Sequence, residues 1–220
     1  MSVTTYHAVA RMTPLLADDF FLLAHDDVSG KARLPARTVG LGLAGALLGE
    51  LVLFGNIEVH TGAVVVVDRR PPADALAHRV LDHLLAEQDS HSVHTWLAFL
   101  AASAAGNVAE RLARFGLVTF QESRLPWRSS RWVPADMTVA AIPAVRLRTY
   151  LLRSEPLAVP DVVLAGLVAA TGLTPTVLWD LPAVTHRYLD YAMSQLPDSL
   201  HAVISETSAA VGNAIASHRI

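Results

Sequence analysis

The pattern of apolar and polar residues predicts a chain that is mostly helical. Leucine, valine and alanine recur at helical spacing, and proline or glycine residues separate the apolar stretches. The longest stretch, from about Ala36 to Phe54, is apolar on all sides and is followed by Gly55. A helix of this kind is buried in a protein core or in a membrane. We expect a mainly α, compact helical domain around this central helix, with residues 1–220 forming one domain.

The segment Thr38–Phe54 raises the question of a membrane span, because the whole chain has a mean hydropathy of +0.38. Its 17 residues lie at the lower limit for a transmembrane helix. Glu50 would cost about 2.5–3.5 kcal/mol near the centre of a bilayer. Four glycines in the segment suit close packing against other helices. We therefore predict a buried core helix.

Two segments interrupt the helical pattern and predict short β-hairpins. In the first, the strand pattern of residues 56–68 turns at His60-Thr61-Gly62. In the second, residues 117–120 and 129–134 can pair on either side of a turn. Each hairpin follows a helix that ends at a glycine, so the sequence repeats one helix–glycine–hairpin unit. We expect the second hairpin to project from the domain.

The second hairpin concentrates arginine and tryptophan in a chain whose net charge is −3. Residues 111–153 contain eight arginines against two acidic residues. Indoles favour the headgroup layer of a membrane, and arginines attract anionic lipids. The sequence thus predicts a surface for contact with a membrane or a partner, formed by Arg124, Trp127, Arg128, Arg131 and Trp132. The other five arginines are expected to lie on solvated helix faces and to pair with acids elsewhere: Arg111, Arg114, Arg146, Arg148 and Arg153.

Other interpretations of this hairpin stay open. It could be an edge that pairs with a second subunit, giving a homo-oligomer, or the wing of a winged-helix nucleic-acid binder. The indoles could also fold back and cover the core. Nucleic acid is disfavoured, because the preceding helix carries only Arg111 and Arg114 and the whole chain is acidic.

Signatures of catalysis or of metal binding are weak. The chain has no cysteine, which excludes disulfides and thiolate metal sites, and its histidines lack ligand spacing. The stretch GLGLAG (40–45) matches a dinucleotide-binding motif, but no buried strand precedes it, so we assign its glycines to helix packing. The pairs Asp18-Asp19 and Asp26-Asp27 are expected to serve as caps and on solvated faces. We expect no catalytic residues, no metal site and no cofactor, and we predict that the protein is not an enzyme.

The order of these elements resembles the Golgi phosphoprotein 3 family in its shorter bacterial form, over most of residues 15–155. The matching residues of the first unit are Gly45, Glu50, Leu51, Leu53, Gly55 and Ile57, and those of the second are Glu110, Arg111, Leu112 and Gly116. The resemblance implies a helical domain with a projecting hairpin. It also implies a peripheral membrane protein, because eukaryotic members recognise phosphatidylinositol 4-phosphate and bind the cytoplasmic tails of glycosyltransferases. In that family the hairpin contributes to membrane contact and self-association.

The family's headgroup site does not carry over to this sequence. The four positions that hold one tryptophan and three arginines in the family align with Pro35, Ala44, Gly106 and Ala109. Small neutral side chains cannot make the bidentate phosphate contacts of arginine. A shifted anion site is predicted from nearby cations: Arg33, Arg37, Arg111 and Arg114. We expect a cytoplasmic adaptor, peripheral on the inner face of the membrane, with an anionic lipid and a client protein as partners.

Overall fold

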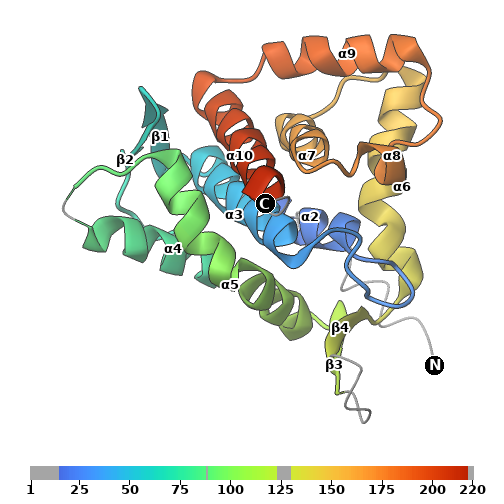
Figure 1. The fold of residues 1–220 in the computed structure, drawn as a ribbon, viewed down its shortest axis with the longest axis horizontal. Helices are drawn as coiled ribbons and strands as arrows, with labels where there is room; N and C mark the ends of the chain where they lie inside the picture. The colour runs from blue at the N-terminus through green and yellow to red at the C-terminus, as the bar shows by residue number, and fades with distance from the viewer. Residues whose placement is uncertain (1–14, 88, 123–129, 218–220) are drawn as a thin grey trace.

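Helices and two antiparallel strand pairs make up the described part of the chain, residues 15–87, 89–122 and 130–217 of a computed structural model (Figure 1). The helices are α2 (Leu16–Ala24), α3 (Ala36–Leu53), α4 (Ala75–Ala86), α5 (Val93–Arg114), α6 (Met137–Arg153), α7 (Val159–Ala170), α8 (Thr174–Val177), α9 (Ala183–Ser194) and α10 (Asp198–Ser217). The strands are β1 (Ile57–His60), β2 (Ala63–Val66), β3 (Val118–Gln121) and β4 (Arg131–Pro134). The predicted mainly α fold with two hairpins is confirmed.

Helix α3 is the centre of the fold. It contacts α2, α5, α7 and α10, and every residue from Thr38 to Leu51 is buried. Among the described helices, α3 alone is long and apolar enough to cross a membrane, but 78% of it is covered by the rest of the fold. The prediction of a buried core helix is confirmed.

The glycines of the GLGLAG stretch allow other elements to approach α3 closely. A Cβ atom on Gly40 would meet the backbone carbonyl oxygen of Ala101 on α5, and one on Gly42 would meet the ring of Phe20. A Cβ atom on Gly45 would meet the hydroxyl oxygen of Thr207 on α10. The packing role predicted for these glycines is confirmed.

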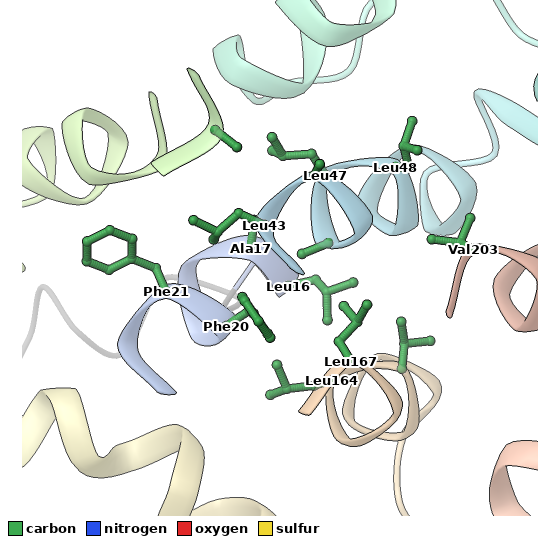
Figure 2. Close-up of a cluster of buried hydrophobic side chains, with 14 of the residues drawn as sticks. Leu16, Ala17, Phe20, Phe21, Leu43, Leu47, Leu48, Leu164, Leu167 and Val203 are labelled. Carbon is green, nitrogen blue, oxygen red and sulfur yellow. The ribbon is translucent and has the colours of Figure 1, made fainter. Parts of the chain in front are cut away.

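Helix α2 is enclosed, since all nine of its residues are buried. In the core, Leu16 and Phe20 of α2 point toward Leu164 and Leu167 of α7, on one side of α3 (Figure 2). Because α2 is covered on all sides, its two polar residues, Asp18 and Asp19, must find partners inside the protein.

The predicted helix–glycine–hairpin unit occurs twice with the same hydrogen bonds. At the end of α3, the N–H of Gly55 donates to the carbonyl of Val52, and the next N–H donates to the carbonyl of Leu51. At the end of α5, the N–H of Gly116 donates to Ala113, and the next N–H donates to Leu112. Both glycines have positive φ, 75° and 72°, as this helix-ending motif requires. A strand begins within two residues of each glycine.

Both predicted hairpins form, with antiparallel strands. Ile57 pairs with Val66 in the first, and Val118 pairs with Pro134 in the second. The second hairpin lies at the periphery of the domain (Figure 1). Its base is fixed against the loop after α2, because Gly30, with φ of 66°, lies directly against the backbone of Trp132.

A matched pair of glycine substitutions tests the packing of α3. Gly42→Ala should destabilise the protein by roughly 1–3 kcal/mol, because the new methyl group would collide with Phe20. Gly212→Ala, on α10 with no atom within 4 Å of the new methyl group, should stabilise the protein by roughly 0.5–1 kcal/mol. Urea unfolding measures both. Equal effects of the two substitutions would contradict the close packing at Gly42.

Candidate functional site

A buried ion cluster joins four segments of the chain through the guanidinium group of Arg111. Its Nε donates to Asp18 of α2 at 2.8 Å, and Nη1 donates to Asp74 at 2.9 Å. Two parallel bonds of 3.0 Å connect Nη1 and Nη2 with the carboxylate of Glu50 on α3. Glu50 also accepts a hydrogen bond from the backbone N–H of Ala17 at 2.8 Å. The side chains of Arg111 and Glu50 are each only 1% exposed, so the cluster is part of the core.

The cluster holds three carboxyl groups against one guanidinium group. The pKa of Asp18 is raised to about 7, chiefly by burial and also by the neighbouring carboxylates of Glu50 and Asp74, while Arg111 acts to lower it. Burial likewise raises the pKa of Glu50, although Arg111 opposes the shift. Burial alone would lower the pKa of Arg111, but Glu50, Asp18 and Asp74 raise it above its usual value. The guanidinium therefore stays charged, and Asp18, whose pKa lies at about 7, gains or loses a proton near neutral pH.

A second arginine binds the other acid of α2. Arg146 of α6 lies 2.6 Å from Asp19 and 2.8 Å from Asp161 at the start of α7. Burial raises the pKa of Asp19, and Arg146 opposes the shift. The prediction that Asp18-Asp19 serves as a cap or on a solvated face is therefore wrong, because the surroundings of α2 bury both residues and supply one arginine to each.

The five arginines that were expected to pair with acids on solvated faces differ in their partners and in their burial. Arg111 pairs with acids in the interior, and the partly buried Arg146, whose side chain is 22% exposed, pairs with Asp19 and Asp161. On the surface, Arg153 lies 3.6 Å from Glu155. Arg148 instead stacks at 4.2 Å over the ring of Trp179 and donates to that residue's carbonyl oxygen. Arg114 is exposed and makes no ion pair with another described residue.

These positions correct the predicted shifted anion site. Arg111 cannot serve in it, because three carboxylates already surround its buried guanidinium. Arg33 lies within 3.5 Å of Asp27 and donates to the carbonyl oxygen of His25. Arg37 is exposed at the start of α3. Arg114 lines a groove beside the second hairpin.

The predicted contact surface is described only in part. Arg124, Trp127 and Arg128 lie outside the described residues. Arg131 is exposed on β4, and the half-buried Trp132 packs partly on the core. The ring of Trp132 lies 5.0 Å from that of Phe120 on β3, which is 51% exposed. Sequence reasoning missed Phe120, although its place opposite Trp132 follows from the strand register.

An open groove of about 490 Å³ lies beside the base of this hairpin. Its lining comes from α4, from the last turn of α5 and from β4: Arg79, Glu110, Ala113, Arg114 and Trp132. The groove combines two guanidinium groups, one carboxylate and an indole. Sequence analysis named Glu110 only as a residue that matches the family, and it missed Arg79, which is distant along the chain from the arginine-rich segment.

Among the described residues, no group of three or more histidine, aspartate or glutamate side chains is arranged so that it could hold a metal ion. Four of the ten histidines have described contacts with a carboxylate or an aromatic ring that are ordinary for surface positions: His60, His78, His83 and His91. The arrangement of the described residues thus offers salt-bridge chemistry in the core and anion contacts at the surface.

Comparison with known proteins agrees with this architecture. The model of the protein family described as Golgi phosphoprotein 3 (GPP34) matches residues 16–217, which is nearly the whole chain. No curated protein matches the chain. The matched range includes the ion cluster around Arg111, the ion pairs of Arg146, both hairpins and the groove.

Arg111→Met should destabilise the protein by about 3–5 kcal/mol, because it leaves three buried carboxyl groups without a cation. Arg114→Met, one turn further along α5 and exposed, is the control and should change stability by less than about 0.5 kcal/mol. The free energy of unfolding in urea measures both. An Arg111→Met protein as stable as the control would contradict the role of the cluster.

Asp18→Asn should remove a pH dependence of stability. The pKa of Asp18 is about 7 in the folded state and 3.8 ordinarily, so the folded state holds this proton between those pH values. The stability that this proton contributes is complete below about pH 4 and is lost as the pH rises through about 7. The asparagine variant should therefore match the wild type at low pH and exceed it by up to about 4 kcal/mol above pH 7.

Unfolding curves between about pH 4 and pH 8 check this difference. Asp190→Asn, at an exposed position of α9, is the control and should follow the wild type throughout. If the Asp18→Asn protein loses stability in parallel with the wild type as the pH rises, Asp18 does not hold the proton.

Proposed function

The chain belongs to the Golgi phosphoprotein 3 family, and we propose that it is a peripheral membrane-associated adaptor protein without catalytic activity. In this proposal it acts in the cytoplasm at the inner face of the membrane. Its partners are an anionic lipid surface and a client protein. The contact surface is the second hairpin, with Arg124, Trp127, Arg128, Arg131 and Trp132.

One observation carries the proposal: the second hairpin carries both an exposed aromatic residue and an exposed arginine that makes no ion pair with a described carboxylate. Phe120 is half exposed and contacts Trp132, and the exposed Arg131 makes no ion pair with another described residue. Elsewhere in this arginine-rich segment, carboxylates neutralise Arg111 and Arg146. The positive charge that remains is therefore concentrated toward the hairpin. Aromatic rings and arginines together suit the interface between lipid headgroups and acyl chains.

The expected affinity is modest. Three arginines near an anionic surface contribute about 1 kcal/mol each, which corresponds to an enrichment of roughly a hundredfold. Useful binding then needs burial of the aromatic side chains, or several copies of the chain acting together. At the four family headgroup positions Pro35, Ala44, Gly106 and Ala109 have no charge, so the proposal names an anionic surface rather than a phosphoinositide.

Self-association through the same hairpin is the second candidate function. Strands β3 and β4 form a two-stranded sheet, and no further strand covers either edge among the described residues. Such uncovered edges can pair with a strand of a second copy. A dimer would also double the number of arginines facing a membrane.

The hairpin arginines should control vesicle binding. The wild type should sediment with vesicles that contain phosphatidylglycerol at low salt and should be released as salt rises. The variant Arg124→Gln/Arg128→Gln/Arg131→Gln should bind on the order of a hundredfold more weakly. The control Arg69→Gln/Arg153→Gln/Arg187→Gln removes the same charge from exposed positions elsewhere and should bind like the wild type.

Sedimentation of these variants, together with light scattering on the wild type and on Phe120→Ser, distinguishes membrane contact from self-association. A wild type that stays in the supernatant at low salt contradicts membrane contact. Equal losses in both triple variants would mean that total charge, rather than the hairpin, determines binding. A mass of two or more chains that falls to one chain in Phe120→Ser would instead support self-association.

A further inference from the structure

We propose that the outward face of α6 is a docking surface for an acidic amphipathic helix of a partner protein. The partner helix would carry apolar residues along one side and glutamate or aspartate on either side of them. We take this partner to be the client of the adaptor role proposed above, but we do not rely on membrane contact, because the surface shares no residue with the hairpin. It is formed by four residues, here called the α6 stripe: Ile142, Val145, Thr149 and Leu152.

The α6 stripe lies opposite the buried side of its helix. Successive residues of an α-helix are rotated by about 100°, which places the stripe on the far side from the residues that α6 buries. Its apolar members therefore face solvent, and Val145 is 59% exposed and Leu152 52% exposed. This side of a surface helix is normally polar. Helix α6 packs on α2 and lies at the edge of the domain (Figure 1). Its buried residues are Ala140, Pro143, Leu147 and Leu151.

The spacing of the stripe suits a second helix. Ile142 and Thr149 are seven residues apart, and so are Val145 and Leu152. Positions that alternate at intervals of three and four within a repeat of seven are those through which two α-helices pack side by side. An amphipathic helix that lies in a membrane has a broader apolar face. The narrow stripe, with a threonine in it, therefore favours a helix as the occupant.

Arg148 and Trp179 extend the surface on one flank of the stripe. The guanidinium of Arg148 lies 4.2 Å from the centre of the Trp179 ring and donates to the carbonyl oxygen of Trp179 at 2.6 Å. This stacking holds the arginine side chain in place, while the indole remains 57% exposed. Tryptophan and arginine are the residue types that most often dominate the binding energy of protein interfaces. A helix on the stripe would thus meet an ordered cation beside an aromatic ring.

The charges beside the stripe favour an acidic partner. Helix α6 contains three arginines and no acidic residue. Two acids of the domain neutralise Arg146, whereas Arg148 makes no ion pair with a described residue. Arg153 lies 3.6 Å from Glu155, but both side chains are exposed, so this contact contributes little. Where two helices pack together, charges beside the apolar seam determine which partner binds.

The same charges disfavour two other occupants. A second copy of the chain, paired through the same stripe, would bring arginines against arginines, and like charges across an interface repel. The chain's own residues 1–14 contain Arg11 and no acidic residue. That segment therefore lacks the carboxylates that Arg148 and Arg153 would attract.

Two designed peptides, tested in solution without lipid, measure the preference. Each has three heptads, about 21 residues, with leucine at the seam positions, and the flanking positions carry glutamate in one peptide and lysine in the other. Fluorescence anisotropy of labelled peptide gives the affinity. We expect the wild type to bind the glutamate peptide about tenfold more tightly than the lysine peptide at low salt, and the difference to shrink as salt rises.

The variant Val145→Ser/Leu152→Ser should weaken binding of the glutamate peptide roughly a hundredfold, because two apolar side chains are no longer there to be buried. Both positions are exposed, so the variant should fold, which urea unfolding checks. The control Val28→Ser/Val67→Ser removes two exposed valines elsewhere on the surface and should bind like the wild type.

Reversal of the charges gives the discriminating result. Arg148→Glu/Arg153→Glu should bind the lysine peptide more tightly than the glutamate peptide. Arg153→Glu alone leaves the stacking of Arg148 on Trp179 in place and should shift the ratio of the two affinities in the same direction. A merely structural role of the arginines would weaken both peptides together. If neither peptide binds the wild type, or if charge reversal leaves the ratio unchanged, the α6 stripe does not bind an acidic helix.

Three further outcomes would each assign the stripe to another occupant and overturn the proposal. Peptide binding that appears only after removal of residues 1–14 would mean that the chain covers its own stripe. A wild-type dimer that becomes a monomer in Val145→Ser/Leu152→Ser would mean that a second copy covers it. Vesicle binding that this variant loses, without any peptide binding, would mean contact with a membrane.

Peptide binding and vesicle binding can fail separately. A wild type that binds the glutamate peptide but no vesicles would support the α6 surface and contradict the membrane function. Vesicle binding that depends on the hairpin arginines, without peptide binding, would do the reverse.

Discussion

The contact on which the rest of the structure depends is the set of hydrogen bonds around Arg111. One guanidinium group binds carboxylates from α2, from α3 and from the cap of α4, and so connects segments that are up to 93 residues apart in sequence. Each charge is tolerable inside the protein only because the others are present. Apolar packing alone would allow these helices to slide, whereas a planar group with directed donors permits one arrangement. The cluster therefore specifies how α2, α3, α4 and α5 meet.

The parts of the fold that local chemistry determines could be predicted from the sequence. The apolar periodicity of α3, the glycines that end α3 and α5, and the alternation in both hairpins depend on neighbours in the chain, and the structure agrees with each of them. The partners of Asp18, Asp19 and Arg111 could not be predicted, because pairing across the core depends on how helices pack. One signal was present: Glu50 is a lone acid in an apolar helix, and a buried acid requires a cation.

The ion pairs of Arg111 and Arg146 determine which arginines of residues 111–153 are left without a carboxylate partner among the described residues. Carboxylates neutralise Arg111 and Arg146, whereas Arg114 and Arg131, near the groove and on the second hairpin, make no ion pair with a described carboxylate. The two candidate contact regions meet at Trp132, whose ring touches Phe120 on one strand and lines the groove with Arg114. A single indole thus connects the exposed aromatic side of the hairpin with the groove that Arg114 lines.

The glycine junction after α5 has a mechanical consequence. Three residues, 115–117, separate the last turn of α5 from β3, and their backbone N–H groups are tied to helix carbonyls. The hairpin is thus a stiff extension of α5 rather than a tethered arm, and Arg111 fastens that helix to the interior one turn earlier. The hairpin and the rest of the domain would therefore change orientation together. If the protein docks through this hairpin, the angle between the hairpin and α5 determines which other faces of the domain stay accessible.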